Sequence, residues 1–289
     1  MDNNNSNANN RNASLLDYIK AYWQYVLPHF FLSGIMRRVT RSQSKFWRTL
    51  FINWIIKIYK VDMSLALNEK TASYKSFNTF FTRRLKPEAR PFVSGDNEIA
   101  CPVDGTVSQA GIIEDGEIFQ AKGRSYSAQQ LLGHPHIDAK QFEGGQFSTI
   151  YLSPRDYHRI HMPVDGTLKT MAHVPGRFFS VSPATTRVIP GLFARNERVV
   201  TLFATEFGPM AMIAVGAIFV GSIETVWYGE VTPPTIPNIR VWHYDNVETK
   251  GSTSENKPIA LKRGEEFGRF KMVSTVILLF GPQTIEWAK

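Results

Sequence analysis

Short runs of β-branched and apolar residues, separated by Gly, Pro, Asp and Asn, fill the chain beyond residue 72. Such runs are too short for ordinary helices and are bounded by the residues that end strands. They lie at residues 105–113, 146–152, 166–174, 198–205, 211–220, 223–227 and 271–280. Because the preceding segment has helical spacing, the sequence predicts an α+β protein: an N-terminal amphipathic helical lobe followed by a largely antiparallel β-sheet domain.

The helical spacing is clearest in residues 45–60. Apolar side chains there recur at intervals of three and four residues, which places them on one face of a helix. They are Trp47, Leu50, Phe51, Trp54, Ile55 and Ile58. A basic helix of this kind can lie in a membrane interface, or its apolar face can pack on the rest of the protein. The spacing alone leaves both interpretations open.

The charge of the chain is concentrated in the same part of the sequence. Residues 11–60 contain nine Lys or Arg and one acid, so they carry the whole formal net charge of +8. Residues 1–13 are rich in Asn and predict a disordered leader. No signal peptide is expected, and residues 21–36 are too short and too polar to span a bilayer. The expected organisation is a leader at 1–13, a basic amphipathic region at 14–72 and a β-rich domain at 73–289.

Two histidines stand in a segment dense in polar residues, at 151–166. His158 and His161 would share a face if this segment made one helical turn. Three interpretations remain open: structural histidines, an acid and base pair, or metal ligands. A zinc site would need further ligands, for which His134 and His136 are available in the sequence.

Two other positions carry reactive groups next to predicted strands. Asp104 stands in a tight turn before the strand at 105–113, and beside a histidine its carboxylate could orient an imidazole base. Ser274 stands at the start of a strongly apolar strand. Each signal is weak alone, because Asp-Gly turns and Ser-Thr pairs are common. The single cysteine, Cys101, cannot form an internal disulfide and favours a reducing compartment.

Taken in order, several stretches resemble phosphatidylserine decarboxylase of the bacterial, proenzyme type, over residues 22–281. They are Y-V-L-P at 25–28, Y-K-V-D-M at 59–63, T-A-S-Y at 71–74, F-N-T-F-F at 77–81, Y-L-S-P-R-D-Y-H-R-I-H-M-P at 151–163, L-F-A-R-N-E-R-V at 192–199, E-F-G-P-M-A at 206–211, V-G-S-I-E-T-V-W at 220–227 and G-R-F-K at 268–271. A match this long and collinear is specific.

The resemblance implies that the chain makes its own cofactor by cutting itself before a serine, here Ser274. By position, Asp104, His161 and Ser274 would act as a protease-like triad: the serine attacks the carbonyl of residue 273, and elimination with loss of ammonia leaves a pyruvoyl group at position 274. This ketone would form a Schiff base with phosphatidylserine, giving phosphatidylethanolamine and CO2. His158 would handle the substrate carboxylate and return a proton to the α-carbon. No metal is implied.

The sequence departs from the family at the cut. The family has Gly before the serine, whereas this chain has Val273, which is β-branched and shields its carbonyl. We therefore expect slowed or abolished self-cleavage, and a non-catalytic, lipid-binding relative is the alternative. A zinc hydrolase using both histidines is a third. Gly-Ser-Thr at 251–253 lies in a charged stretch and is interpreted as a decoy.

The resemblance also implies the partners and the location. We expect phosphatidylserine and an anionic membrane surface as partners, no nucleic acid, a homodimer, and α and β subunits after cleavage. Because the substrate is a bilayer lipid, interfacial binding becomes the favoured interpretation of the basic region. The expected location is peripheral, on the cytoplasmic face of the cell membrane.

Overall fold

The computed structural model describes residues 12–91, 95, 97–134, 137–218, 222–232, 238–244, 258–271, 274–283 and 285–287. Its helices are α1 (Leu15–Tyr22), α2 (His29–Arg41), α3 (Lys45–Tyr59), α4 (Phe77–Phe81), α5 (Ala128–Leu132), α6 (Pro183–Val188) and α7 (Leu192–Arg195). Short 3₁₀ turns lie at Trp23–Val26, Thr71–Ser73, Pro87–Ala89 and Ala139–Phe142. Within this part of the chain, no helix is both long enough and apolar enough to cross a bilayer.

The strands form antiparallel sheets. The large, eight-stranded sheet has the order β1 (Thr106–Ile112), β4 (Gly145–Leu152), β14 (Ser274–Pro282), β8 (Gly208–Gly216), β7 (Arg198–Thr205), β6 (Gly166–Val174) and β11 (Arg240–His243), with β12 (Ala260–Leu261) also paired to β6. The small sheet has the order β10 (Gly229–Glu230), β9 (Ile223–Thr225), β13 (Glu266–Phe270) and β5 (Arg159–His161). A separate hairpin pairs β2 (Glu117–Ala121) with β3 (Arg124–Ser127).

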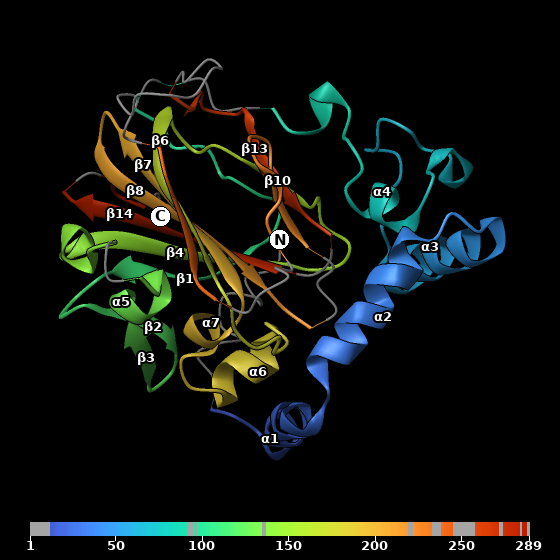
Figure 1. Cartoon of the computed structure of the whole chain (residues 1–289), viewed down its shortest axis with the longest axis horizontal. Helices are drawn as coiled ribbons and strands as arrows, with labels where there is room; N and C mark the ends of the chain where they lie inside the picture. Colours follow the sequence, from blue (N-terminus) through green and yellow to red (C-terminus); the bar gives the residue numbers. More distant parts are fainter. Residues whose placement is uncertain are drawn as a thin grey trace.

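The large sheet is covered on both faces (Figure 1). Helices α5 to α7 and the β2–β3 hairpin pack on one face, and the small sheet packs on the other. Strand β14 is central and contributes alternate side chains to the two cores: Val276, Leu278 and Phe280 to one, Ile277 and Leu279 to the other. A strand that is buried on both faces has a nearly continuous run of apolar residues, and residues 276–280 form such a run.

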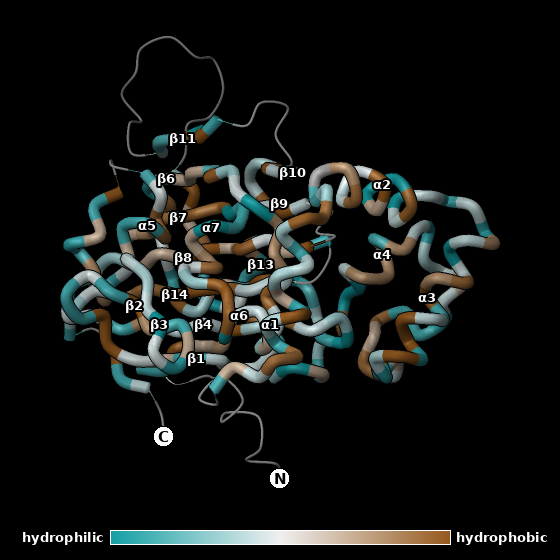
Figure 2. The backbone as a smooth tube through the Cα atoms, turned by 90° about the horizontal axis from the view of Figure 1, so that it is seen from below, coloured by the Kyte–Doolittle hydropathy of each residue, from teal (hydrophilic) through white to brown (hydrophobic). Residues whose placement is uncertain are grey.

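The helical lobe lies beside the sheets, as Figure 2 shows from below for α2, α3 and α4. Ser14 caps α1 through a reciprocal bond with Asp17, and Asp17 also forms an ion pair with Arg187 of α6. Helix α3 contacts α4 through the buried Ile55 and the rings of Phe51 and Phe77, whose centroids are 4.4 Å apart. The Asp17–Arg187 ion pair thus links α1 to α6 of the sheet domain, and aromatic packing holds α3 on α4.

The predicted α+β class, with helices first and antiparallel strands after them, is confirmed. The predicted helix at 45–60 is α3, and the predicted strands at 166–174 and 198–205 match β6 and β7 residue for residue. The proposed leader, 1–13, falls almost entirely outside the described residues.

Candidate active site

Ser274 is the first residue of β14 and is fully buried. Its backbone pairs on one side with Leu152, the last residue of β4, and on the other with Gly216, the last residue of β8. Its Oγ has no hydrogen-bond partner among the described residues. A buried hydroxyl normally finds a partner, so an unpaired one at a strand end is a candidate for chemistry. Val273, the other half of the expected cut, lies outside the described residues.

The segment with the two histidines connects the two sheets. After β4 ends, Ser153 and Asp156 close a turn in which the Ser153 N–H donates to Asp156 Oδ2 at 2.6 Å. The chain then enters β5, which pairs with β13 through Ile160 and Gly268. The segment is therefore extended and makes no helical turn, so the condition under which His158 and His161 would share a face is not met. Because side chains alternate along a strand, residues three apart point to opposite sides, and the two histidines have separate surroundings.

His158 is enclosed in the protein interior. Its Nδ1–H donates to the carbonyl of Asp156 at 2.9 Å, and its ring lies against Phe81, with the centroids 4.1 Å apart. Its Nε2 has no hydrogen-bond partner in the described part of the chain. Burial lowers the pKa of His158 to about 3, so the imidazole is neutral at physiological pH. It therefore presents an unpaired, basic nitrogen in a dry environment.

His161 lies at the other end of β5 and is only partly buried. Its Nδ1–H donates to the carbonyl of Gly264 at 2.8 Å, which fixes the tautomer and leaves a lone pair on Nε2. The Tyr157 hydroxyl donates to that Nε2 at 3.2 Å. Burial raises the pKa of Tyr157 to about 12, so the tyrosine stays a donor. His161 is thus held with Nδ1 as the donor and Nε2 as the accepting nitrogen.

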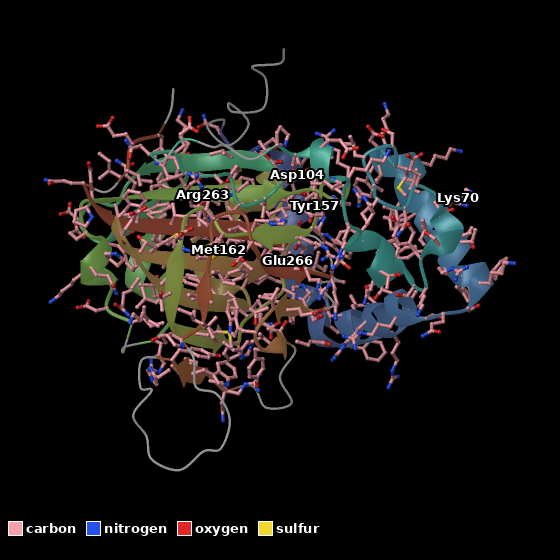
Figure 3. The ribbon with its side chains drawn as sticks, turned by 90° about the horizontal axis from the view of Figure 1, so that it is seen from above. Lys70, Asp104, Tyr157, Met162, Arg263 and Glu266 are labelled. Carbon is pink, nitrogen blue, oxygen red and sulfur yellow. The ribbon has the colours of Figure 1, made fainter. Side chains whose placement is uncertain are left out.

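Asp104 and His161 line the same cavity, which has a volume of about 350 Å³. Tyr157 and Arg90 also line it, and Figure 3 shows Asp104 and Tyr157 close together on the sheet domain. Both carboxylate oxygens of Asp104 accept from the Arg90 guanidinium, through Nε at 2.7 Å and through Nη2. This ion pair raises the pKa of Arg90. His158 and Ser274 are not part of the wall of this cavity, although both are described.

Sequence reasoning missed three residues that shape these groups: Arg90, Tyr157 and Phe81. Tyr157 stands inside the histidine segment, and Phe81 inside F-N-T-F-F, but nothing in the spacing indicated which ring each would meet. The zinc interpretation cannot be followed in full, because His136 lies outside the described residues. Among those that are described, no three His, Cys, Asp or Glu are grouped to hold a metal.

Comparison with known proteins finds, over nearly the whole chain, the same family that the sequence motifs resemble. A family model described as phosphatidylserine decarboxylase matches residues 77–289, and a second, described as PSD, matches 19–60. Curated relatives called phosphatidylserine decarboxylase proenzyme include one from Idiomarina loihiensis, 51% identical, and one from Shewanella sp. strain MR-4, 52% identical; in both, the match covers 94% of this chain and 90% of the relative. A third, from Shewanella frigidimarina, is 51% identical over 94% of this chain and 92% of its own length. The chain therefore belongs to the phosphatidylserine decarboxylase family.

Proposed function

We propose that this chain decarboxylates phosphatidylserine to phosphatidylethanolamine, using a pyruvoyl group that it makes from Ser274. The observation that carries the proposal is the placement of Ser274: a fully buried hydroxyl without a partner in the described residues, at the head of the central strand. In a family whose relatives are called proenzymes, such a hydroxyl supports self-cleavage at this position.

The residues fit a small ketone formed at position 274. Ser274 is buried, and its own Oγ has no hydrogen-bond partner among the described residues. Conversion of this residue therefore breaks no existing side-chain hydrogen bond. The pyruvoyl group, when present, supplies a carbonyl that accepts the electrons released with CO2. His158 supports this chemistry from the protein side, because its Nε2 is unpaired and its neutral ring can accept or return a proton.

For the cut itself, we propose that His161 takes the hydroxyl proton of Ser274 as the serine attacks the carbonyl carbon of residue 273. The hydrogen bond that His161 Nδ1–H donates to the Gly264 carbonyl supports this role, because it leaves Nε2 as the base. Asp104 supplies negative charge in the same cavity and stabilises the imidazolium that forms. Arg90 and Tyr157 hold these two groups before the reaction.

The second candidate is a lipid-binding relative that does not cut itself, and the observation that favours it is Val273. The two candidates differ in the intact mass of the purified protein. A processed chain gives a 16-residue fragment, 274–289, with a blocked pyruvoyl end, and an unprocessed chain stays at 32.8 kDa. Release of labelled CO2 from phosphatidylserine then tests the activity.

We expect Val273→Gly to raise the rate of self-cleavage. If valine reaches the reactive conformation at a cost of about 1–2 kcal/mol relative to glycine, the rate rises roughly tenfold. Ser274→Ala is the matched control, and it stays uncut with either valine or glycine at position 273. If Val273→Gly also stays whole, although folded, the assigned role of residue 273 is wrong. If both chains are cut and neither releases CO2, the proposed activity is wrong.

The helical lobe supports a membrane surface as the place of action. Helices α1 to α3 leave large apolar side chains exposed, among them Leu16, Ile19, Trp23, Phe31, Phe46, Trp47, Leu50, Trp54 and Ile58. The same segment carries the net positive charge of the chain, which attracts anionic lipid by up to about 1 kcal/mol per cation. We propose peripheral binding to the cytoplasmic face through this surface.

We also propose that the chain forms a homodimer and, after the cut, consists of α and β subunits. The family resemblance is the ground for both. Analytical ultracentrifugation of the uncut Ser274→Ala chain separates a dimer from a monomer of 32.8 kDa.

A further inference from the structure

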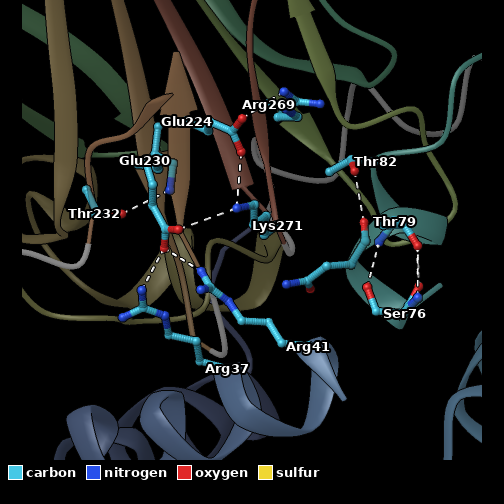
Figure 4. Close-up of polar contacts among 12 residues, drawn as sticks. Arg37, Arg41, Ser76, Thr79, Thr82, Glu224, Glu230, Thr232, Arg269 and Lys271 are labelled. Carbon is cyan, nitrogen blue, oxygen red and sulfur yellow. Dashed lines mark hydrogen bonds and ion pairs between the residues drawn. The ribbon is translucent and has the colours of Figure 1, made fainter. Parts of the chain in front are cut away.

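A second cavity, of about 400 Å³, lies between the helical lobe and the small sheet. One wall comes from α4 and the residues beside it, including Lys75, Asn78 and Thr82. The opposite wall is formed by Arg269 and Lys271, at the end of β13, and Arg41 closes it at the end of α2. Figure 4 shows Ser76, Thr79 and Thr82 across from Arg269 and Lys271, with the charged ends of Arg41 and Lys271 turned toward Glu230. We call this space the lobe cleft.

The lobe cleft is positively charged. Four cations line it, Arg41, Lys75, Arg269 and Lys271, against one carboxylate, Glu224. Glu224 contacts Arg269 at 2.7 Å and Lys271 at 3.1 Å, so it neutralises part of this charge. From outside the wall, Glu230 contacts Arg41 and Lys271, and Glu266 contacts Arg269 at 3.9 Å. The four lining cations still outnumber the three carboxylates that contact them. An excess of cations in a concave site attracts an anion.

Asn78 adds a polar group that lacks a partner. It is 7% exposed, and its Oδ1 has no hydrogen bond within the described residues. The main-chain carbonyl of Asn78 is already used, because the Thr82 hydroxyl donates to it at 2.9 Å. A buried amide without a partner is costly, and by turning it can offer an oxygen or an NH2 to a ligand. The lobe cleft therefore combines charge with an unused hydrogen-bonding group.

The lobe cleft adjoins the candidate active site through two covalent connections. Lys271 precedes Ser274 by three residues, so their Cα atoms are at most about 11 Å apart. Thr82 lines the cleft, and the residue before it, Phe81, packs on the His158 ring. The Thr82 carbonyl also accepts from Arg159 Nε at 3.0 Å, which ties this wall to β5. A ligand in the lobe cleft is therefore close to both Ser274 and His158.

We propose that the lobe cleft binds the phosphate of a glycerophospholipid headgroup. This inference rests on the proposed function, in which the substrate is a phosphodiester. In phosphatidylserine only the short serine side chain separates the phosphate from the amine that reacts, so the phosphate has to lie near Ser274. The lobe cleft supplies cations at that range, and Arg41 and Lys75 connect it to the lobe whose exposed apolar side chains we propose face the bilayer.

The test measures binding separately from catalysis. Calorimetry on the whole Ser274→Ala chain uses glycerophosphoserine, glycerophosphoethanolamine, inorganic phosphate and free serine. We expect both diesters to bind and free serine not to bind. Lys75→Gln, at an exposed position, is expected to weaken diester binding about three- to tenfold, as the loss of one charged contact does. Asn78→Asp, of the same shape, adds a negative charge and should weaken it further.

Lys70→Gln is the matched control, since Lys70 lies in the same lobe, outside the cleft wall (Figure 3). Equal affinities for Lys75→Gln and Lys70→Gln would overturn the proposal. Inorganic phosphate bound more tightly than the diesters would overturn the lipid assignment. In the active chain, Lys75→Gln should raise the KM for dihexanoyl phosphatidylserine with little change in kcat. Diester binding without CO2 release from any processed chain would instead refute the proposed function and leave the lobe cleft assignment standing.

Discussion

Two histidines of one short segment acquire different chemistry from their surroundings. His158 is buried against Phe81, and one of its nitrogens has no partner among the described residues, whereas His161 is held at both nitrogens, by Gly264 and Tyr157. Burial disfavours the charged form of the first, and hydrogen bonding fixes the tautomer of the second. The residue types were visible in the sequence, but this division of roles depends on partners from distant parts of the chain.

The low pKa of His158 predicts a pH-dependent loss of stability. In the unfolded chain this histidine binds a proton below pH 6.5, whereas in the folded chain it does so only below about 3. Between these values the unfolded state holds more protons, so the free energy of unfolding falls as the pH falls. One such group contributes up to about 1.4 kcal/mol per pH unit. His158→Gln should remove this slope.

The measurement is urea unfolding of the uncut Ser274→Ala chain at several pH values from 4 to 7. His243→Gln is the control, because His243 is exposed and its loss should leave the slope as it is. A slope that is unchanged in His158→Gln would show that His158 is accessible to protons in the folded state.

The sequence predicted four site residues by their positions in the family resemblance: Asp104, His158, His161 and Ser274. Their immediate partners were not predictable in the same way. Arg90, which contacts Asp104, lies fourteen residues before it in the sequence. Gly264, which contacts His161, lies more than a hundred residues after it. Nothing local distinguishes Arg90 from other surface arginines. Position in a family motif predicts which residues react, whereas the contacts of these residues depend on tertiary structure.

At the scale of elements, the central strands were predictable because they are buried on both faces. Strands β6, β7 and β14 are runs rich in β-branched and apolar residues. The predicted runs missed β2, β3, β5 and β10 to β13. Each of these strands has only two to five residues and exists through its pairing with a neighbour. The pairing of β5 with β13 also makes the segment of His158 and His161 extended, so the helical turn that would have put them on one face does not form.

Helix α3 divides its apolar residues between two environments. Ile52 and Ile55 are buried in the core, whereas Trp47, Leu50 and Trp54 are about half exposed or more. Packing on the rest of the protein thus accounts for only part of the stripe. If the exposed part lies in the membrane interface, Trp47→Ala together with Trp54→Ala should weaken binding to phosphatidylserine vesicles at least about tenfold.

Sedimentation of sucrose-loaded vesicles measures this binding. Phe119→Ala is the matched control, because Phe119 is an exposed aromatic on the β2–β3 hairpin, outside the helical lobe. Binding of the wild-type chain should also fall with added salt, since part of the attraction is electrostatic. Equal losses in Phe119→Ala and in the tryptophan double variant would show that the α3 surface has no special role.

At the scale of the whole molecule, one carboxylate connects the lobe to the sheets. Glu230, on β10, contacts Arg37 and Arg41 of α2 and also Lys271 after β13 (Figure 4). Burial alone would raise the pKa of Glu230, but Lys271 and the two arginines lower it below its ordinary value of 4.5. The stabilisation is therefore present above pH 4.5 and is lost as the pH falls further.

Glu230→Gln should therefore loosen the lobe from the sheet domain. The substitution leaves three cations without their shared carboxylate, and we expect a loss of about 1 kcal/mol in the free energy of unfolding, or about 2–4 °C in the melting temperature. Protease cleavage between α2 and α3, at 42–44, should become faster. Glu69→Gln is the control: its pair with Lys86 is at the surface, with the carboxylate 56% exposed, and should contribute little. If both variants melt and are cut alike, Glu230 does not hold the lobe, and the Asp17–Arg187 ion pair and the packing of Phe81 on His158 hold it instead.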